Sequence, residues 1–121
     1  MYTKEIQDAL KYTSWFKGVF ASDMLPQPER RMSMIVNTDS ADKEGTHWIA
    51  VFVQNNIAEY FDPFGLPPLT KNFVDFLGLF EIWCHSNTTI QDINSEKCGE
   101  FCIAFVKERT KVRTVKEMIK L

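Results

Sequence analysis

Four residues of the chain have side chains that could act together in nucleophilic catalysis, and they occur in the order His47, Asp62, Gln91 and Cys98. A cysteine attacks a carbonyl carbon as its thiolate, so it needs a neighbouring base that accepts its proton. An imidazole can be that base when a carboxylate holds one ring nitrogen and leaves the other facing the thiol. A side-chain amide could then donate a hydrogen bond to the oxyanion. These residue types indicate acyl transfer at a thiol.

Cys98 is the strongest candidate for the nucleophile. It follows the polar stretch 86–97 and begins an apolar pattern of helical spacing, which predicts a position at a helix N-terminus. Unpaired N–H groups and the helix dipole favour the thiolate there. Gly99 has no side chain, so the backbone of a substrate could approach closely. Gln91 lies seven positions before Cys98, and its amide could serve as an oxyanion donor beside the Cys98 backbone N–H.

Residues 47–65, HWIAVFVQNNIAEYFDPFG, place the histidine and the aspartate at the outer ends of a predicted hairpin. Two apolar runs flank the polar residues 54–56, whose side chains are typical of a turn. A hairpin brings its outer ends together, so we expect His47 and Asp62 to lie side by side. Trp48 follows the histidine and could shield the imidazole from water.

The same residues also have structural interpretations. A single histidine at a strand edge is usually structural. An aspartate before a proline is a common turn residue, so the catalytic interpretation of Asp62 rests only on its order and spacing in the chain. We interpret Cys102, four positions after Cys98, as a core residue on the same helix face. Cys84 and His85 lack the spacing of a zinc knuckle with these cysteines, so no metal site is predicted.

The remaining patterns predict a small α+β domain that positions these residues. We expect a central, mainly antiparallel sheet flanked by helices, with the nucleophile at the N-terminus of a buried helix. The expected helices cover 3–17, ended by Gly18, then 70–79, the segment beginning at Cys98, and a separate short helix over 115–121. The expected strands cover 32–38, 47–53, 57–61 and 82–85, and residues 20–31 are expected to be irregular.

Composition and charge narrow the classes of protein. The 121 residues fit one domain over 1–121, and 45% hydrophobic with 25% charged residues is ordinary for a globular protein. A net charge of −2 gives no footprint for nucleic acid. The apolar runs are too short to span a bilayer, and the first residues lack a secretory signal. Three cysteines cannot all pair, so we expect an intracellular, reducing environment.

Three strings, GTHWIAVF, YFDPFG and QDINSEKCGEFC, together resemble the adenovirus-type (adenain-like) cysteine endopeptidases. That family shares its site arrangement with the ubiquitin-like-protein proteases, in the chain order His, Asp or Glu, Gln, Cys, with Trp after the His. The resemblance covers roughly residues 15–106. It implies catalytic roles for His47, Asp62, Gln91 and Cys98, with support from Trp48 and Gly99.

The resemblance also implies a function and its setting. It implies an endopeptidase that cuts capsid or core precursor proteins during maturation of particles of a virus or a virus-like mobile element. Such an enzyme needs no cofactor, works in the host cell and can be packaged in the particles. The adenovirus enzymes are stimulated by a small peptide and by DNA, but neither dependence is carried over. The chain is acidic overall, and Cys84 does not lie where the peptide-bonding cysteine is expected.

Two alternatives stay open. The acidic residue is Asp62, as in the ubiquitin-like-protein proteases, where the adenovirus enzymes have Glu. An isopeptidase that removes ubiquitin-like modifiers is therefore the second interpretation. The third is a binding module that has kept the fold and lost the activity, although retention of all four site residues argues against it.

Overall fold

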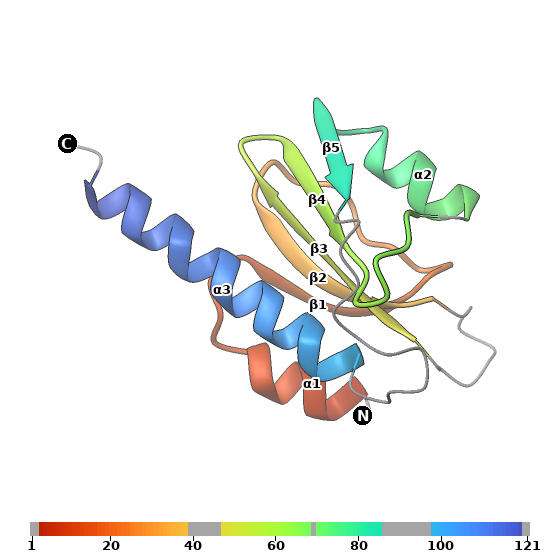
Figure 1. The fold of residues 1–121 in the computed structure, drawn as a ribbon, viewed down its shortest axis with the longest axis horizontal. Coiled ribbons are helices and arrows are strands. Elements are labelled where there is room, and N and C mark those ends of the chain that lie inside the picture. Colours follow the sequence, from red (N-terminus) through yellow and green to blue (C-terminus); the bar gives the residue numbers. More distant parts are fainter. Residues whose placement is uncertain (1–2, 39–46, 69, 86–97, 120–121) are drawn as a thin grey trace.

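The computed structural model describes residues 3–38, 47–68, 70–85 and 98–119 (Figure 1). In chain order the elements are α1 (Thr3–Leu10), β1 (Phe16–Ala21), β2 (Met32–Asn37), β3 (Trp48–Gln54), β4 (Ile57–Phe61), α2 (Lys71–Leu77), β5 (Ile82–His85) and α3 (Cys98–Ile119). The predicted α+β class is confirmed, since helices pack on both faces of one sheet.

The sheet has five strands in the order β1-β2-β3-β4-β5. Its centre is antiparallel, because β3 pairs with β2 on one side and with β4 on the other. The two outer pairs, β1 with β2 and β4 with β5, are parallel. A parallel neighbour requires a crossover, and α2 lies within the crossover that leads from β4 to β5. The sheet is therefore mixed, with the expected antiparallel core.

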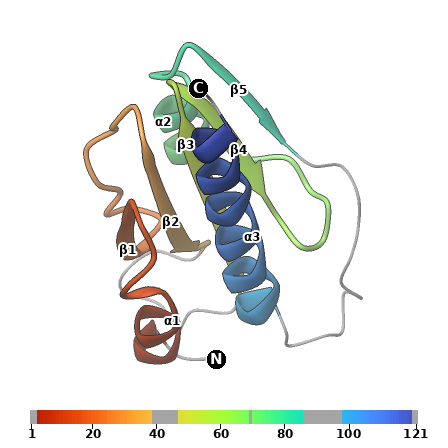
Figure 2. The same ribbon diagram turned by 90° about the vertical axis from the view of Figure 1, so that its left-hand side faces the viewer.

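Each face of the sheet carries its own hydrophobic core. Helices α1 and α3 cover one face and α2 covers the other (Figure 2). The strands β2 and β3 are buried almost throughout, because both of their faces are covered. The α3 side contains Ile6, Leu10, Ile35, Trp48, Ala50, Phe52, Phe61, Cys98, Cys102, Phe105 and Val106.

The predicted hairpin is present, with a tight turn between β3 and β4. The ladder pairs Gln54 with Ile57, so only Asn55 and Asn56 form the loop. Both asparagines have positive φ angles, 54° and 63°, as a type I′ turn requires. Asparagine tolerates this conformation better than other residues with side chains.

The prediction of a first helix reaching residue 17 and ended by Gly18 is wrong. Helix α1 stops at Leu10, and Gly18 lies within β1 with a φ of 138°. Only Ile6 and Leu10 of the helix are buried. The apolar residues that follow, including Phe16, instead pack as a strand beside β2.

A separate helix over 115–121 is also not found. Helix α3 continues from Cys98 to Ile119 without interruption. The sequence contains no proline in this range and no glycine after Gly99, so nothing stops the helix. No helix within the described residues is long and apolar enough to cross a membrane.

Candidate active site

The predicted contact between His47 and Asp62 is present. His47 Nε2 and Asp62 Oδ1 lie 2.9 Å apart, and the two side chains are only 15% and 5% exposed. The ladder pairs Ala50 with Phe61, so its continuation places Ile49 level with Asp62. The imidazole therefore reaches the carboxylate diagonally rather than straight across. A buried carboxylate in this contact holds the Nε2 proton and orients the ring.

A tight turn directly after β4 fixes the position of Asp62. The Gly65 N–H donates to the Asp62 carbonyl at 2.8 Å and closes a four-residue turn. The Phe64 N–H donates to Asp62 Oδ1, also at 2.8 Å. Gly65 has a φ of 76°, a conformation that favours glycine. The same carboxylate oxygen thus meets both the imidazole and a backbone amide.

The ring of Phe64 stacks on the imidazole of His47. The two ring centroids are 4.4 Å apart and the ring planes differ by 6°. The FDPFG string predicted only Asp62 as a site residue, and the contact with Phe64 was not expected. The available signal was the two-residue spacing, because the turn that begins at Asp62 brings Phe64 back to the carboxylate that holds His47.

Cys98 is the first residue of α3, so its predicted position at a helix N-terminus is confirmed, and its side chain is 5% exposed. It lies near enough to His47 for each group to change the charge state of the other. His47 Nδ1 is buried and has no hydrogen-bond partner of good geometry among the described residues. Contacts between a nucleophile and its base are often long in an unliganded site and shorten when substrate binds.

The electrostatics favour a thiolate beside an imidazolium. Burial disfavours the charged form of His47, but the hydrogen bond to Asp62 and the contact with Cys98 outweigh it and raise its pKa to about 9. Burial would likewise raise the pKa of the Cys98 thiol. The imidazole and the backbone amides of Trp48 and Gly99 outweigh that effect and lower the pKa below its usual value.

Trp48 contributes to the site mainly through its backbone. Its amide lies against Cys98, and its carbonyl accepts a hydrogen bond from Cys102 Sγ at 3.4 Å. Its side chain belongs to the core between the sheet and α3, so the ring stacked on His47 is that of Phe64. Cys102 is fully buried, and burial raises its pKa well above the usual value, which makes it an inert thiol.

Gln91 lies outside the described residues, so its role as an oxyanion donor stays a prediction. Gly99 is the second residue of α3 and is buried beside Cys98. No cluster of three His, Cys, Asp or Glu side chains that could hold a metal ion occurs within residues 3–38, 47–68, 70–85 and 98–119.

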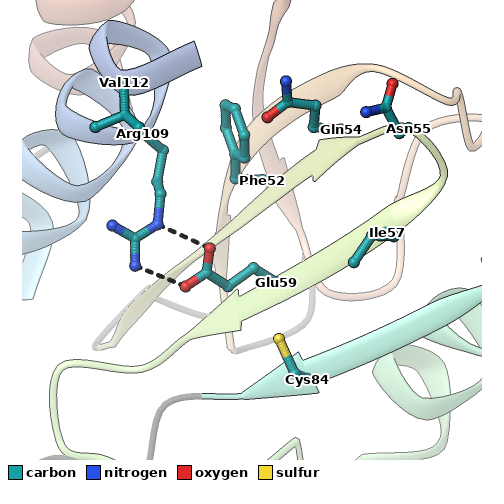
Figure 3. Close-up of a pocket in the computed structure, with 8 residues that line it drawn as sticks. All are labelled: Phe52, Gln54, Asn55, Ile57, Glu59, Cys84, Arg109 and Val112. Carbon is teal, nitrogen blue, oxygen red and sulfur yellow. Dashed lines mark hydrogen bonds and ion pairs between the residues drawn. The ribbon is translucent and has the colours of Figure 1, made fainter. Parts of the chain in front are cut away.

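An ion pair about three helical turns from Cys98 ties α3 to the sheet (Figure 3). Arg109 Nε and Nη2 donate to the two carboxylate oxygens of Glu59 on β4, both at 2.8 Å. The guanidinium also lies 4.8 Å from the ring centroid of Phe105. Beside this pair is an open cavity of about 380 Å³, with the exposed Cys84 in its lining. The pair therefore attaches α3 to β4.

Comparison with known proteins identifies similar solved structures. Two crystal structures of the pS273R protease of ASFV (African swine fever virus) resemble the chain. The first, of the selenomethionine form, has a TM-score of 0.51 and 19% identity and covers 69% of this chain and 36% of that one. The second has a TM-score of 0.57 and 15% identity, and covers 88% of this chain and 54% of that one.

The chain thus spans about a third to a half of the length of the protease it resembles. No protein-family model matches the sequence, and none of the curated proteins is significantly similar to it. At these identities the likeness concerns the fold. The chain therefore shares its α+β fold with a viral protease.

Proposed function

We propose that the protein is a cysteine endopeptidase with Cys98 as nucleophile, His47 as general acid and base, and Asp62 as the residue that orients His47. One observation carries the proposal. A buried cysteine with a lowered pKa lies at a helix N-terminus beside a histidine whose far ring nitrogen is held by a buried carboxylate. Perturbed ionisation of this kind is concentrated at functional sites.

The reaction follows from the charge states. The Cys98 thiolate attacks the carbonyl carbon of the scissile peptide, and the carbonyl electrons move to its oxygen. When the C–N bond breaks, the His47 imidazolium gives its proton to the departing amine. A water molecule, deprotonated by the now neutral His47, attacks the thioester and releases the acid. The thiolate and the imidazolium are then restored.

The transient oxyanion needs hydrogen-bond donors. The first backbone amides of α3 have no carbonyl partner within the helix, which makes the amide of Cys98 a suitable donor. The amide side chain of Gln91 is proposed as the second donor on the basis of the sequence resemblance.

The fold likeness to a viral protease supports a protease in general. The sequence resemblance supports precursor proteins of a virus or virus-like element as substrates. In this proposal the chain acts in the host cell and can be packaged into particles. It needs no metal or organic cofactor, and neither a membrane nor nucleic acid is among its partners. An isopeptidase acting on ubiquitin-like modifiers remains the second candidate, since Asp62 is the acid typical of those enzymes.

Covalent labelling would test the proposal. Wild-type protein and the Cys98→Ala and Cys102→Ala variants would be treated with a peptide vinyl sulfone and analysed by mass spectrometry, in parallel with digestion of a peptide library. We expect labelling at Cys98 and cleavage by the wild type and by Cys102→Ala only. An unlabelled Cys98 and an undigested library would indicate a binding module. Reaction only with a vinyl sulfone of a ubiquitin-like protein would favour the isopeptidase.

A further inference from the structure

Phe64 makes two contacts with the His47–Asp62 pair, from different parts of the residue. Its backbone N–H donates to Asp62 Oδ1, the same oxygen that meets His47 Nε2. Its ring covers one face of the imidazole, 4.4 Å away and within 6° of parallel. The turn closed by Gly65 fixes the backbone of Phe64. A single residue thus touches both the carboxylate and the ring that the carboxylate orients.

The ring of Phe64 restricts a rotation of the His47 imidazole that the hydrogen bond to Asp62 alone would allow. A single hydrogen bond at Nε2 leaves the imidazole able to rotate about the line from Nε2 to Oδ1. An aromatic ring lying flat against one face blocks that rotation and keeps Nδ1 in one plane. The face of a benzene ring is also electron-rich, so it interacts more favourably with a charged imidazolium than with neutral imidazole.

We propose that Phe64 is a positioning residue that fixes the plane of the His47 ring and favours its protonated form. This role rests on the proposed protease function for its catalytic meaning, but the effect on His47 can be measured without any substrate. The titratable groups that act on His47 are Asp62, at the end of β4, and Cys98, at the start of α3. Neither is changed by substitutions at position 64. Burial lowers the pKa of His47, so the replacement side chain has to be apolar and keep the imidazole covered. A lowered pKa of His47 would then report on loss of the aromatic face.

Two substitutions separate the ring from the backbone contact. Phe64→Leu keeps an apolar side chain and the N–H that binds Asp62, but removes the aromatic face. Phe64→Tyr keeps the face and serves as the conservative variant. Phe64→Met, which is flexible and apolar, is a second test should the leucine variant fold poorly. Leu66→Ala, at an exposed apolar residue just after the turn, is the control.

The measurement is a titration of the histidine ring protons by NMR. The chain has two histidines, and His85→Gln identifies the ring signals of His47, since His85 is exposed on β5. We expect Phe64→Leu and Phe64→Met to lower the pKa of His47 by roughly half a unit or more, as expected for loss of a cation–π contact. The pKa of His47 in Phe64→Tyr and Leu66→Ala should match the wild type.

Peptide cleavage gives a second, independent readout. Cleavage needs protonated His47 for departure of the amine, so its alkaline limit in Phe64→Leu should move to lower pH by the same amount as the titration. An unchanged pKa of His47 in folded Phe64→Leu or Phe64→Met would overturn the proposal, whatever the effect on stability. A second outcome separates the two proposals. If the pKa of His47 shifts in the Phe64 variants but the wild type neither cleaves peptides nor reacts with the vinyl sulfone, the positioning role is supported and the protease function is refuted.

Discussion

Substituting Asp62 by asparagine would remove one charge from the candidate site and leave its hydrogen-bond geometry almost intact. Asp62 Oδ1 meets His47 Nε2 at 2.9 Å and the Phe64 N–H at 2.8 Å. An amide oxygen in the same place can accept both hydrogen bonds. Asp62→Asn therefore separates the electrostatic contribution of the carboxylate from its role in orienting the imidazole.

The size of the effect of Asp62→Asn on the charge states follows from the pKa values of His47 and Cys98. The balance between thiol with imidazole and thiolate with imidazolium depends on the difference between the pKa values of His47 and Cys98. Burial opposes the charged imidazole, and Asp62 and Cys98 raise the pKa of His47 to about 9 against that opposition. Loss of an adjacent carboxylate charge lowers a pKa by about 1–3 units. The equilibrium constant for the ion pair should fall by the corresponding factor, about 10- to 1000-fold.

The assay is the rate at which iodoacetamide alkylates Cys98, followed by mass spectrometry between roughly pH 5 and pH 9. In the wild type the thiolate should form at lower pH than in an ordinary cysteine, because the pKa of Cys98 is lowered. In Asp62→Asn the pKa of Cys98 should rise, since burial remains while the imidazolium is lost. Alkylation near neutral pH should then slow by about tenfold or more, and peptide turnover should fall at least as far.

Asp75→Asn is the matched control, because Asp75 is an exposed carboxylate on α2 that pairs with Lys71. It should leave both rates unchanged. If Asp62→Asn alkylates and cleaves like the wild type at neutral pH, the Asp62 charge does not sustain the ion pair. If its loss of activity instead matches a loss of folded protein in thermal unfolding, the role of Asp62 is structural.

Three further predictions concern the nucleophile, the oxyanion and the attachment of α3. Cys98→Ala should abolish cleavage without unfolding the protein. Cys102→Ala should still cleave but lose about 1 kcal/mol of unfolding free energy, since it removes a fully buried sulfur. Gln91→Ala should slow peptide turnover by roughly a hundredfold while iodoacetamide still alkylates Cys98 normally, because alkylation forms no oxyanion. Equal loss of both rates would show that Gln91 positions Cys98 instead. Arg109→Met and Glu59→Gln should each lower the free energy of unfolding by about 0.5–1 kcal/mol, measured by denaturant unfolding. The double variant should lose less than the sum of the two single losses. Full additivity would mean that the bidentate pair contributes nothing to stability.

The central hairpin and its neighbours were predictable because local and tertiary preferences agree there. The strand-forming runs of β2, β3 and β4 are apolar and rich in β-branched or aromatic residues, and the asparagines of the turn adopt positive φ angles readily. The position of Cys98 at the start of α3 followed from the change from polar to helical apolar spacing. The candidate site residues His47, Asp62 and Cys98 were selected from their residue types and their order in the chain.

Strand β1 could not be predicted from local pattern. Its six residues, FKGVFA, follow a helix and include Gly18, which is unfavourable in a strand interior. Its conformation is decided by pairing with β2, whose residues lie more than ten positions further along the chain. Tertiary pairing of this kind overrides weak local preferences.

The register of the central hairpin was not fixed by the sequence alone. The expected turn covered residues 54–56, whereas the observed loop of Asn55 and Asn56 alone pairs Gln54 with Ile57 and Ala50 with Phe61. In a ladder with a period of two, a shift of one residue would send each side chain to the other face of the sheet. The type I′ turn therefore sets which side chains of β4 face α3 and where Asp62, the residue after β4, meets His47. The stacking of Phe64 on His47 depends in addition on the turn from Asp62 to Gly65, which follows the last pair of the ladder.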